Sequence, residues 1–448
     1  MGKPQVIDDQ EHERVFDRAA AVDVAKASGV VCTRLPHPSR PGGRQSAVWT
    51  VPATMSAVAG LAARLAADQV QMVTLESTAD YWRIWYYVLE AAGLRVQLVT
   101  ASQARNLPGR PKTDRLDAMW LARLTENGLL RPSFVPPAPV RVLRHYCRAR
   151  THRVQDRTRC WQRLEKLLED ALIKVSSVAS KLTTLSAQDM IKAMIAGERD
   201  PQVLAGLARG RMRAKHAALA DALAGMFADH HAELAGLLLD QIAFLDTRVT
   251  RLTILISEQL ATISAAWGID ADGTTGPGAG TSGNPVALPA IARLDEIPGI
   301  TAELAASIMS ETGLDMTRFP TASHLVSWAG LCPRTHQSGT RARHGKGTGN
   351  TYLRGYLGQA ATGATGTATF LGERHARIAR RRGPAKAQVA VARSLLVIIW
   401  HLLRDPQARY ADLGPGHYQN RIDKTRKARN HIRQLEALGY TVTITQAA

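Results

Sequence analysis

The order of apolar segments near the N-terminus is the feature that most constrains how this chain can fold. Residues 19–35 form two β-rich runs around a small-residue turn at Ala27–Gly29, and a third run follows at Val48–Val51. Such closely spaced runs predict a meander of antiparallel strands. Helical and strand patterns then alternate, at residues 55–67 (helix), 70–75 (strand), 81–92 (helix), 96–99 (strand) and about 113–125 (helix). This order predicts an α/β domain over residues 1–135.

Four acidic residues lie on these segments. Asp23 interrupts the first apolar strand, and Glu76 directly follows the strand at 70–75. Asp114 and Asp117 are three residues apart, so a helix brings them to one face. Carboxylates that converge repel one another unless a divalent cation neutralises them, and oxygen ligands suit Mg²⁺ or Mn²⁺. We therefore interpret all four acids as metal ligands, and two such ions could hold a phosphodiester between its attacking and leaving oxygens.

Each acid by itself also has a simpler interpretation. Asp114 can cap the N-terminus of its helix, and Glu76 can be a solvated strand end. Asp23 is harder to explain in this way, because a charge inside an apolar strand requires a partner or a metal. The four acids, in this order and on these elements, favour the metal site.

A second candidate site lies in the C-terminal half, where residues 328–354 read WAGLCPRTHQSGTRARHGKGTGNTYLR. Its glycines let backbone N–H groups approach a ligand, and its cations favour a phosphate; they are Arg334, Arg341, Arg343, Lys346 and Arg354. Ser338 lies among them and could attack a phosphodiester whose developing charge the arginines stabilise. From this segment alone, a turn serine in a DNA-contacting loop is the simpler interpretation. On a strand, His336 would share a side with Ser338 and could accept its proton.

Composition favours a polyanionic partner and a reducing compartment. The formal net charge of +19 favours nucleic acid over a membrane. The four cysteines contain no CxxC pair, so neither a disulfide framework nor a zinc site is expected. The N-terminus lacks the apolar run of a signal peptide, and the apolar stretch at 395–403 is too short to span a bilayer. We expect a cytoplasmic protein.

Long helices are expected over residues 136–267. Apolar residues recur every seventh position from Val140 to Leu168 and, more cleanly, from Leu238 to Ile263. The second seam favours a two-stranded coiled coil, and we expect it to be an oligomer contact. The two helices could equally pair with each other as an antiparallel hairpin around an alanine-rich, helical insertion at 175–230. Residues 268–286 have the composition of a flexible linker.

The remaining chain is expected to form a small helical domain, residues 287–404, and a basic tail, residues 405–448. The Pro298–Gly299–Ile300 turn is typical of a helix-hairpin-helix, whose turn amides can hold a DNA phosphate. Helices are predicted at about 351–361 and 386–403. The cations of the tail predict a peripheral basic helix on the nucleic-acid side.

Seven motifs occur in a fixed order along the chain: VDVAK around Asp23, TLESTADY around Glu76, KTDRLDA around Asp114 and Asp117, then IPGI, FPTASHLVSWAGL, P-x-x-x-QSG and GN-x-x-LR. Together they resemble the insertion-sequence 110 family of transposases. The resemblance covers most of the chain outside the insertion and the tail. The element order of the first domain is also that of a ribonuclease-H-like fold.

The resemblance implies a Holliday-junction-resolvase-like N-terminal domain in which Asp23, Glu76, Asp114 and Asp117 form a DEDD set of metal ligands. It implies Ser338 as the nucleophile that attacks DNA. It also implies guidance by a structured bridge RNA that the element encodes, and assembly of the acids and the serine from different subunits of a dimer or tetramer.

The sequence thus predicts a DNA recombinase that moves its own insertion sequence through a phosphoserine intermediate, with Mg²⁺ held by the acids. A metal-dependent, structure-specific endonuclease in which water attacks is a second interpretation. A non-catalytic nucleic-acid-binding protein is a third, and the acid set argues against it.

Overall fold

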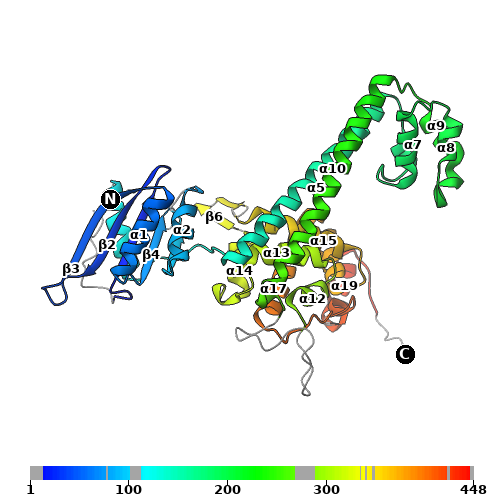
Figure 1. Ribbon diagram of the computed structural model, residues 1–448. Helices are drawn as coiled ribbons and strands as arrows, with labels where there is room; N and C mark the ends of the chain where they lie inside the picture. The colour runs from blue at the N-terminus through cyan, green and yellow to red at the C-terminus, as the bar shows by residue number, and fades with distance from the viewer. Residues whose placement is uncertain are drawn as a thin grey trace, which may run out of the picture. The chain divides into compact units, whose positions relative to one another are not determined.

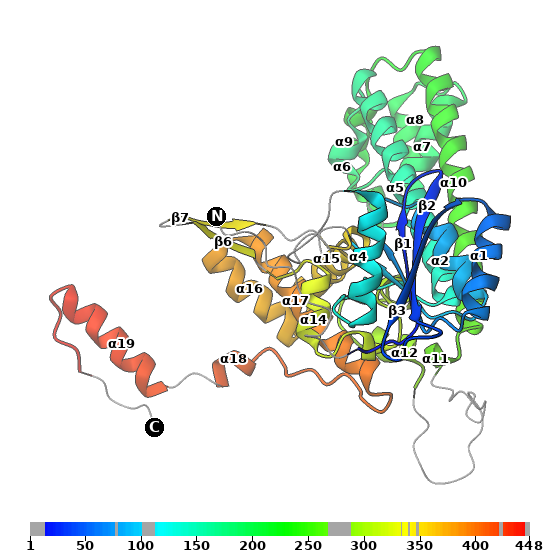
Figure 2. The ribbon, with the colours of Figure 1, turned by 90° about the vertical axis from the view of Figure 1, so that its left-hand side faces the viewer.

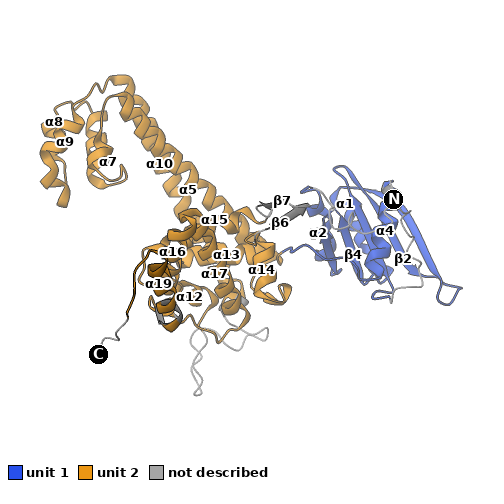
Figure 3. Ribbon diagram, turned by 180° about the vertical axis from the view of Figure 1, so that it is seen from behind, with its two compact units in different colours: residues 1–135 blue, residues 136–448 orange. Residues whose placement is uncertain are grey.

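The structure is a computed structural model, which describes residues 14–76, 79–100, 113–267, 288–332, 334–338, 341–345, 349–420 and 424–443. Figure 3 shows its two compact units, residues 1–135 and 136–448. The α/β segments predicted near the N-terminus all lie in the first unit. The predicted linker at 268–286 lies outside the described residues.

A mixed five-stranded sheet forms the centre of the first unit. Its strand order is β3-β2-β1-β4-β5. The first three strands form the predicted antiparallel meander, and the last two run parallel to β1. The strands are β1 (Ala19–Val24), β2 (Ser28–Pro36), β3 (Arg44–Pro52), β4 (Met72–Glu76) and β5 (Val96–Val99).

Helices cover both faces of this sheet. Because side chains alternate along a strand, Ala20 packs toward Trp85 of α2 (Trp82–Ala91), whereas Ala21 packs toward Leu121. Figure 2 shows α1 and α2 on one side of the sheet and α4 on the other. Their bounds are Met55–Ala67 for α1 and Asp114–Glu126 for α4. The arrangement is compatible with a ribonuclease-H-like DEDD domain.

Two long helices dominate the second unit (Figure 1). α5 (Ala138–Asp170) and α10 (Asp229–Ala261) each have 33 residues and are about 50 Å long. They are antiparallel, since Gln259 donates to the carbonyl of Pro139 at 3.1 Å and Arg157 forms an ion pair with Asp246. Of the two arrangements that the sequence allowed, the hairpin within one chain is present.

The insertion at the end of this hairpin has a core of its own. Its elements are α6 (Val175–Val178), α7 (Leu185–Ile195), α8 (Pro201–Gly206), the 3₁₀ helix η1 (Gly210–Lys215) and α9 (His216–Leu223). Buried side chains of these elements, among them Met190 and Leu219, pack together with Leu164 and Leu168 of α5. The predicted helical insertion is therefore a folded subdomain.

The other end of the hairpin joins a helical body. Its elements are α11 (Ser264–Trp267), α12 (Ala290–Asp295), α13 (Ala302–Thr312), η2 (Met316–Arg318), α14 (Ala322–Trp328), α15 (Thr351–Thr365), α16 (Phe370–Arg382), α17 (Pro384–Arg404), α18 (His417–Asn420) and α19 (Lys424–Ala437). Among the described residues, α17 alone is long and apolar enough to cross a membrane, and half of its apolar window is buried. It packs against α14, α15 and α16, with Leu395 and Ile399 fully buried, and is thus a core helix of this body.

Candidate active site

Asp23 and Glu76 lie side by side at one end of the sheet. The parallel register pairs Asp23 on β1 with Glu76, the last residue of β4. Both belong to the face that α4 covers: Ala21 packs with α4, and Thr125 of α4 donates a 2.7 Å hydrogen bond to Thr74. Glu76 is 5% exposed. Since neighbouring strands are about 4.8 Å apart, these two carboxylates are close neighbours.

Helix α4 runs toward the opposite end of the sheet. Its last residue, Glu126, forms a 2.5 Å ion pair with Arg34, which is paired across the sheet with Ala19, the first residue of β1. The C-terminus of α4 therefore lies where β1 begins, and the two elements are antiparallel. The 13 residues of α4 and the 6 of β1 each span about 20 Å. The first turn of α4 consequently lies where β1 and β4 end.

That first turn carries the other two acids. Thr113 is the N-cap, because its side chain accepts a 3.4 Å hydrogen bond from the backbone N–H of Leu116. Asp114 is therefore the first residue inside the helix, and the interpretation of Asp114 as the cap is wrong. The side chain of Asp114 lies outside the described part of the chain, whereas that of Asp117 is half-buried. The partial positive charge of a helix N-terminus favours carboxylates here.

The structure thus brings Asp23, Glu76 and the first turn of α4 to one end of the first unit. Oxygen donors from two strands and a helix turn form the kind of ligand set that Mg²⁺ and Mn²⁺ prefer. Buried or half-buried acids in such proximity repel one another, and a divalent cation removes that repulsion. Asp23, Glu76 and the turn that carries Asp117 thus lie at the same end of this unit.

Ser338 lies on a two-stranded ribbon and not in the loop that the sequence predicts. The ribbon consists of β6 (Arg334–Ser338) and β7 (Arg341–Gly345), which are antiparallel. The register pairs Ser338 with Arg341 at the end of β6, and His336 with Arg343. Lys346 lies outside the described residues, and Arg354 lies on α15. Ser338 belongs to the second unit, so the serine and the acids are on separately folded units.

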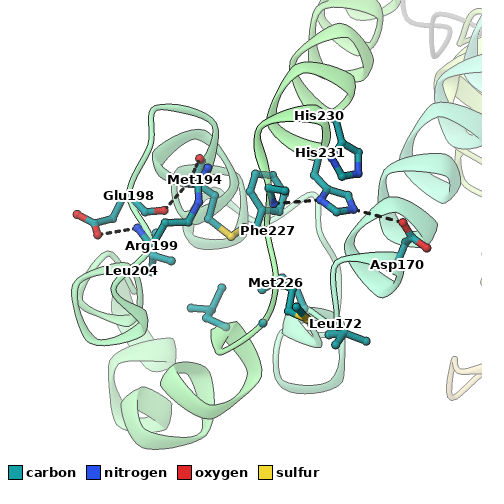
Figure 4. A pocket seen from close by; sticks show the side chains of 14 residues that line it. Asp170, Leu172, Met194, Glu198, Arg199, Leu204, Met226, Phe227, His230 and His231 are labelled. Carbon is teal, nitrogen blue, oxygen red and sulfur yellow. Dashed lines mark hydrogen bonds and ion pairs between the residues drawn. The ribbon is translucent and has the colours of Figure 1, made fainter.

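A further cluster of possible metal ligands was not predicted from the sequence. Asp170, His230 and His231 lie beside a cavity of about 760 Å³ at the end of the hairpin (Figure 4), with one ligand atom of each within 4.8 Å of the others. The backbone N–H of Ala228 donates to Nδ1 of His231 at 3.1 Å, and Nε2 lies 3.3 Å from Asp170. The sequence signal is a histidine three residues after the N-cap of a long helix.

The hydrogen bonds of His231 oppose metal binding. An amide N–H can only donate, so Nδ1 must be the unprotonated nitrogen of a neutral ring, and Nε2 then carries the proton toward Asp170. A metal ion can bind Nε2 only if Nε2 loses its proton. With Nδ1 already unprotonated in the bond to Ala228, the ring would then have to be an anion. His231 therefore serves as part of a helix cap, in which it takes the place that Glu or Gln has in a capping box.

Comparisons with known protein families agree with this geometry. Residues 20–173, which include all four acids, match the family model of the DEDD transposases, and residues 291–375, which include Ser338, match the transposase IS116/IS110/IS902 family. These matches thus define a DEDD transposase. The two matches cover slightly more than half of the chain, which belongs to the insertion-sequence 110 family.

One curated relative is the insertion element IS110 uncharacterized 43.6 kDa protein of Streptomyces coelicolor. It is 31% identical over 118 residues, a match that covers 25% of this chain and 28% of the relative. The match thus spans less than a third of that relative's length.

Proposed function

We propose that this protein is the transposase of an insertion sequence, and that it cuts and rejoins DNA through a covalent link to Ser338. The observation that supports this most is the pairing of Asp23 with Glu76 beneath the first turn of α4, because such a set of oxygen ligands can hold the divalent ions that assist phosphodiester cleavage. Membership in a transposase family supports the same reaction class. The formal net charge of +19 suits a DNA substrate.

The metal would be held by Asp23, Glu76 and Asp117, with Asp114 as the fourth ligand, and would supply stabilisation of the charge that develops on the phosphate. Ser338 Oγ forms a bond to phosphorus while the bond from phosphorus to one sugar oxygen breaks. The hydroxyl proton passes to a base, and the leaving sugar oxygen takes up a proton. The phosphoserine link conserves the bond for rejoining, which is the reverse exchange with a new DNA hydroxyl.

The cationic residues around the serine would bind the DNA backbone. Arg334 begins β6, Arg341 and Arg343 lie on β7, and Arg354 lies on the helix that follows the ribbon; Lys346 completes the set. Cations near a phosphate lower the energy of its developing charge. We further propose a structured guide RNA and a homo-oligomer in which the acids and the serine meet, and both proposals rest on the family resemblance. A cytoplasmic location is proposed from the scattered cysteines of the sequence.

The first test separates the metal site from the nucleophile. Asp23→Asn and Asp117→Asn should each lower metal-dependent strand cleavage at least about 100-fold while thermal unfolding stays unchanged, because a lost ligand disables the ion and not the core. Asp80→Asn is the matched control, since Asp80 is an exposed acid of the same unit that pairs with Arg83. Activity of both variants at the level of this control, or cleavage in excess chelator, would contradict the metal site.

The second part of the test concerns the covalent link. Ser338→Ala should abolish a denaturant-resistant protein–DNA adduct and leave DNA binding in place. A Ser338→Ala protein that still cleaves DNA in the presence of Mg²⁺ without an adduct would support the endonuclease in which water attacks. Neither cleavage nor adduct from the wild-type protein, with DNA bound, would favour the non-catalytic alternative.

A further inference from the structure

The segment that carries Ser338 begins and ends at one point of the helical body. The outgoing part of the chain passes Gly330, whose φ is +73°, and the returning part passes Gly349. A Cβ on Gly349 would lie 2.2 Å from the carbonyl oxygen of Ala329 and 2.5 Å from the N of Gly330. Only a glycine permits this approach, so the outgoing and returning parts of the chain are in contact at the base of the ribbon.

Asn350, the next residue, joins this base to the core. Its side-chain Oδ1 accepts a 3.1 Å hydrogen bond from the backbone N–H of Leu353 and so caps α15. Its Nδ2 donates a 2.6 Å hydrogen bond to Glu311 Oε2. Because Oδ1 must accept, Nδ2 must face Glu311, and both groups of the amide are used. The orientation of Asn350 is thus determined by the cap on one side and by Glu311 on the other.

Glu311 is a fully buried carboxylate near the C-terminus of α13, 0% exposed. Arg148 of α5 donates to its two oxygens at 2.7 and 2.9 Å, and Arg144 lies 3.4 Å from Oε2. Burying a charge is unfavourable unless cations and hydrogen bonds compensate for it. The Glu311 carboxylate thus has fixed, directional acceptors that hold two partly exposed groups, the guanidinium of Arg148 and the side-chain amide of Asn350.

We propose that Glu311 is a positioning residue for Ser338: through Asn350 it anchors the base of the β6–β7 ribbon to α5, and so sets the direction in which the ribbon presents the serine. The motif GN-x-x-LR then has a structural meaning, since Gly349 closes the base, Asn350 anchors it and Leu353 is buried in the body. This inference rests on the proposed role of Ser338 as the nucleophile.

The test exchanges donor and acceptor between the two residues. In Asn350→Asp a carboxylate faces the carboxylate of Glu311, and in Glu311→Gln the charge that holds Arg148 and Asn350 is lost. The double variant reverses the bond, because the new amide on α13 can donate to the new carboxylate at the base of the ribbon. That carboxylate still caps α15, and the amide oxygen on α13 can still accept from Arg148. Glu303→Gln is the control: Glu303 lies on the same helix, is half exposed and pairs with Arg150 of α5 at 2.5 Å.

Two readouts are measured on the full-length protein. Amide hydrogen exchange of β6 and β7 reports the order of the ribbon without any reaction, and the rate of adduct formation at saturating DNA reports the serine. Each single variant should speed ribbon exchange and slow adduct formation by about 10- to 100-fold, the effect of losing a hydrogen bond to a charged group. DNA affinity should stay within about threefold, and the double variant should recover both readouts to the level of the control.

Ribbon exchange that is unchanged in both single variants would overturn the inference. A double variant that is more stable to unfolding than the single variants but recovers neither readout would overturn it as well. If the wild-type protein forms no adduct, the proposed role of Ser338 fails. The exchange measurement still decides in that case whether Glu311 orders the ribbon.

Discussion

Burial controls the reactivity of single residues in the helical body. Cys147 on α5 is 1% exposed and packs against α13, where the hydroxyls of Ser307 and Ser310 lie near its sulfur. Loss of hydration disfavours the thiolate and raises the pKa of Cys147 to about 11. Because the thiolate is the reactive form, Cys147 is a packing residue at neutral pH. Cys332, just before the ribbon, is a partly exposed thiol.

This shift predicts a loss of stability at alkaline pH. A pKa that is higher in the folded state contributes stability that is complete below the ordinary thiol pKa of 9.0 and disappears as the pH rises through about 11. The contribution is roughly 2–3 kcal/mol. Denaturant unfolding between pH 8 and 11 should show this loss in the wild-type protein and in Cys332→Ala, and a smaller loss in Cys147→Ala. An equal loss in all three proteins would show that Cys147 is not the group responsible.

At the scale of elements, helix packing explains Gly299, which the sequence analysis places in a turn that could hold a DNA phosphate. Gly299, in the turn between α12 and α13, has φ of +88°. A Cβ there would lie 2.2 Å from the carbonyl oxygen of Ala360 and 2.7 Å from the N of Ala364, both on α15. The turn therefore packs directly on the backbone of α15, which only glycine allows. Phosphate binding by the other amides of this turn stays a prediction.

The α5–α10 hairpin explains the heptad pattern of both helices. Ile242 and Leu245 are buried against Cys160 of α5, so the seam is covered within the chain. We expected an oligomer contact because the apolar side chains of this seam would otherwise be exposed. They are instead covered by α5. Two arginines that interrupt the α5 seam also have partners there, since Arg150 donates to Thr253 at 2.9 Å and Arg157 pairs with Asp246.

Leu245→Ala should therefore destabilise the second unit by about 2–4 kcal/mol, the usual effect of deleting a buried leucine side chain. The oligomeric state should not depend on this residue. Leu237→Ala is the matched control on the same helix, because Leu237 is 62% exposed; its effect should stay below about 0.5 kcal/mol. Denaturant unfolding and light scattering measure the two quantities. A smaller particle of unchanged stability for Leu245→Ala would instead place this seam between chains.

At the scale of the whole molecule, part of the excess positive charge lies on the C-terminal helix. α19 (Lys424–Ala437) carries several of the tail cations, among them Arg429 and Arg433. The helix that the sequence predicts in the tail is therefore present. α16, another basic helix, ends in Arg380, Arg381 and Arg382. Cations that neutralise phosphates release counterions from the nucleic acid, which makes binding dependent on salt.

Nucleic-acid binding should accordingly weaken steeply with salt, with a log–log slope of about −0.9 for each phosphate contact on duplex DNA. Replacing Arg429 and Arg433 by alanine should make this slope shallower by about one for each phosphate that is no longer neutralised, and should weaken binding evenly across sequences. Fluorescence anisotropy from about 50 to 300 mM salt measures both effects. A slope that the double variant leaves unchanged would remove the tail from the nucleic-acid surface.

The sequence by itself determined the local elements and singled out the four acids as candidate ligands. Two β-rich runs around the turn at Ala27–Gly29 predicted the β1–β2 hairpin. The position of Asp23 inside an apolar strand marked it as a candidate site residue, and its role as a metal ligand stays a prediction. These features could be predicted because period-two and helical patterns are local: they depend on which face of a short segment must be buried. The assignment of Ser338 came from a family resemblance and stays a prediction.

Only the tertiary structure decided which of these faces meet. The register of Asp23 with Glu76, the pairing of α5 with α10 and the bond from Asn350 to Glu311 each join residues far apart in the chain. A heptad seam packs equally well on a second chain or on its own neighbour, and an acidic side chain has the same local pattern at a cap, at a metal or in an ion pair. The choice between them depends on long-range geometry, in which the whole chain must bury its apolar faces and compensate its buried charges at once.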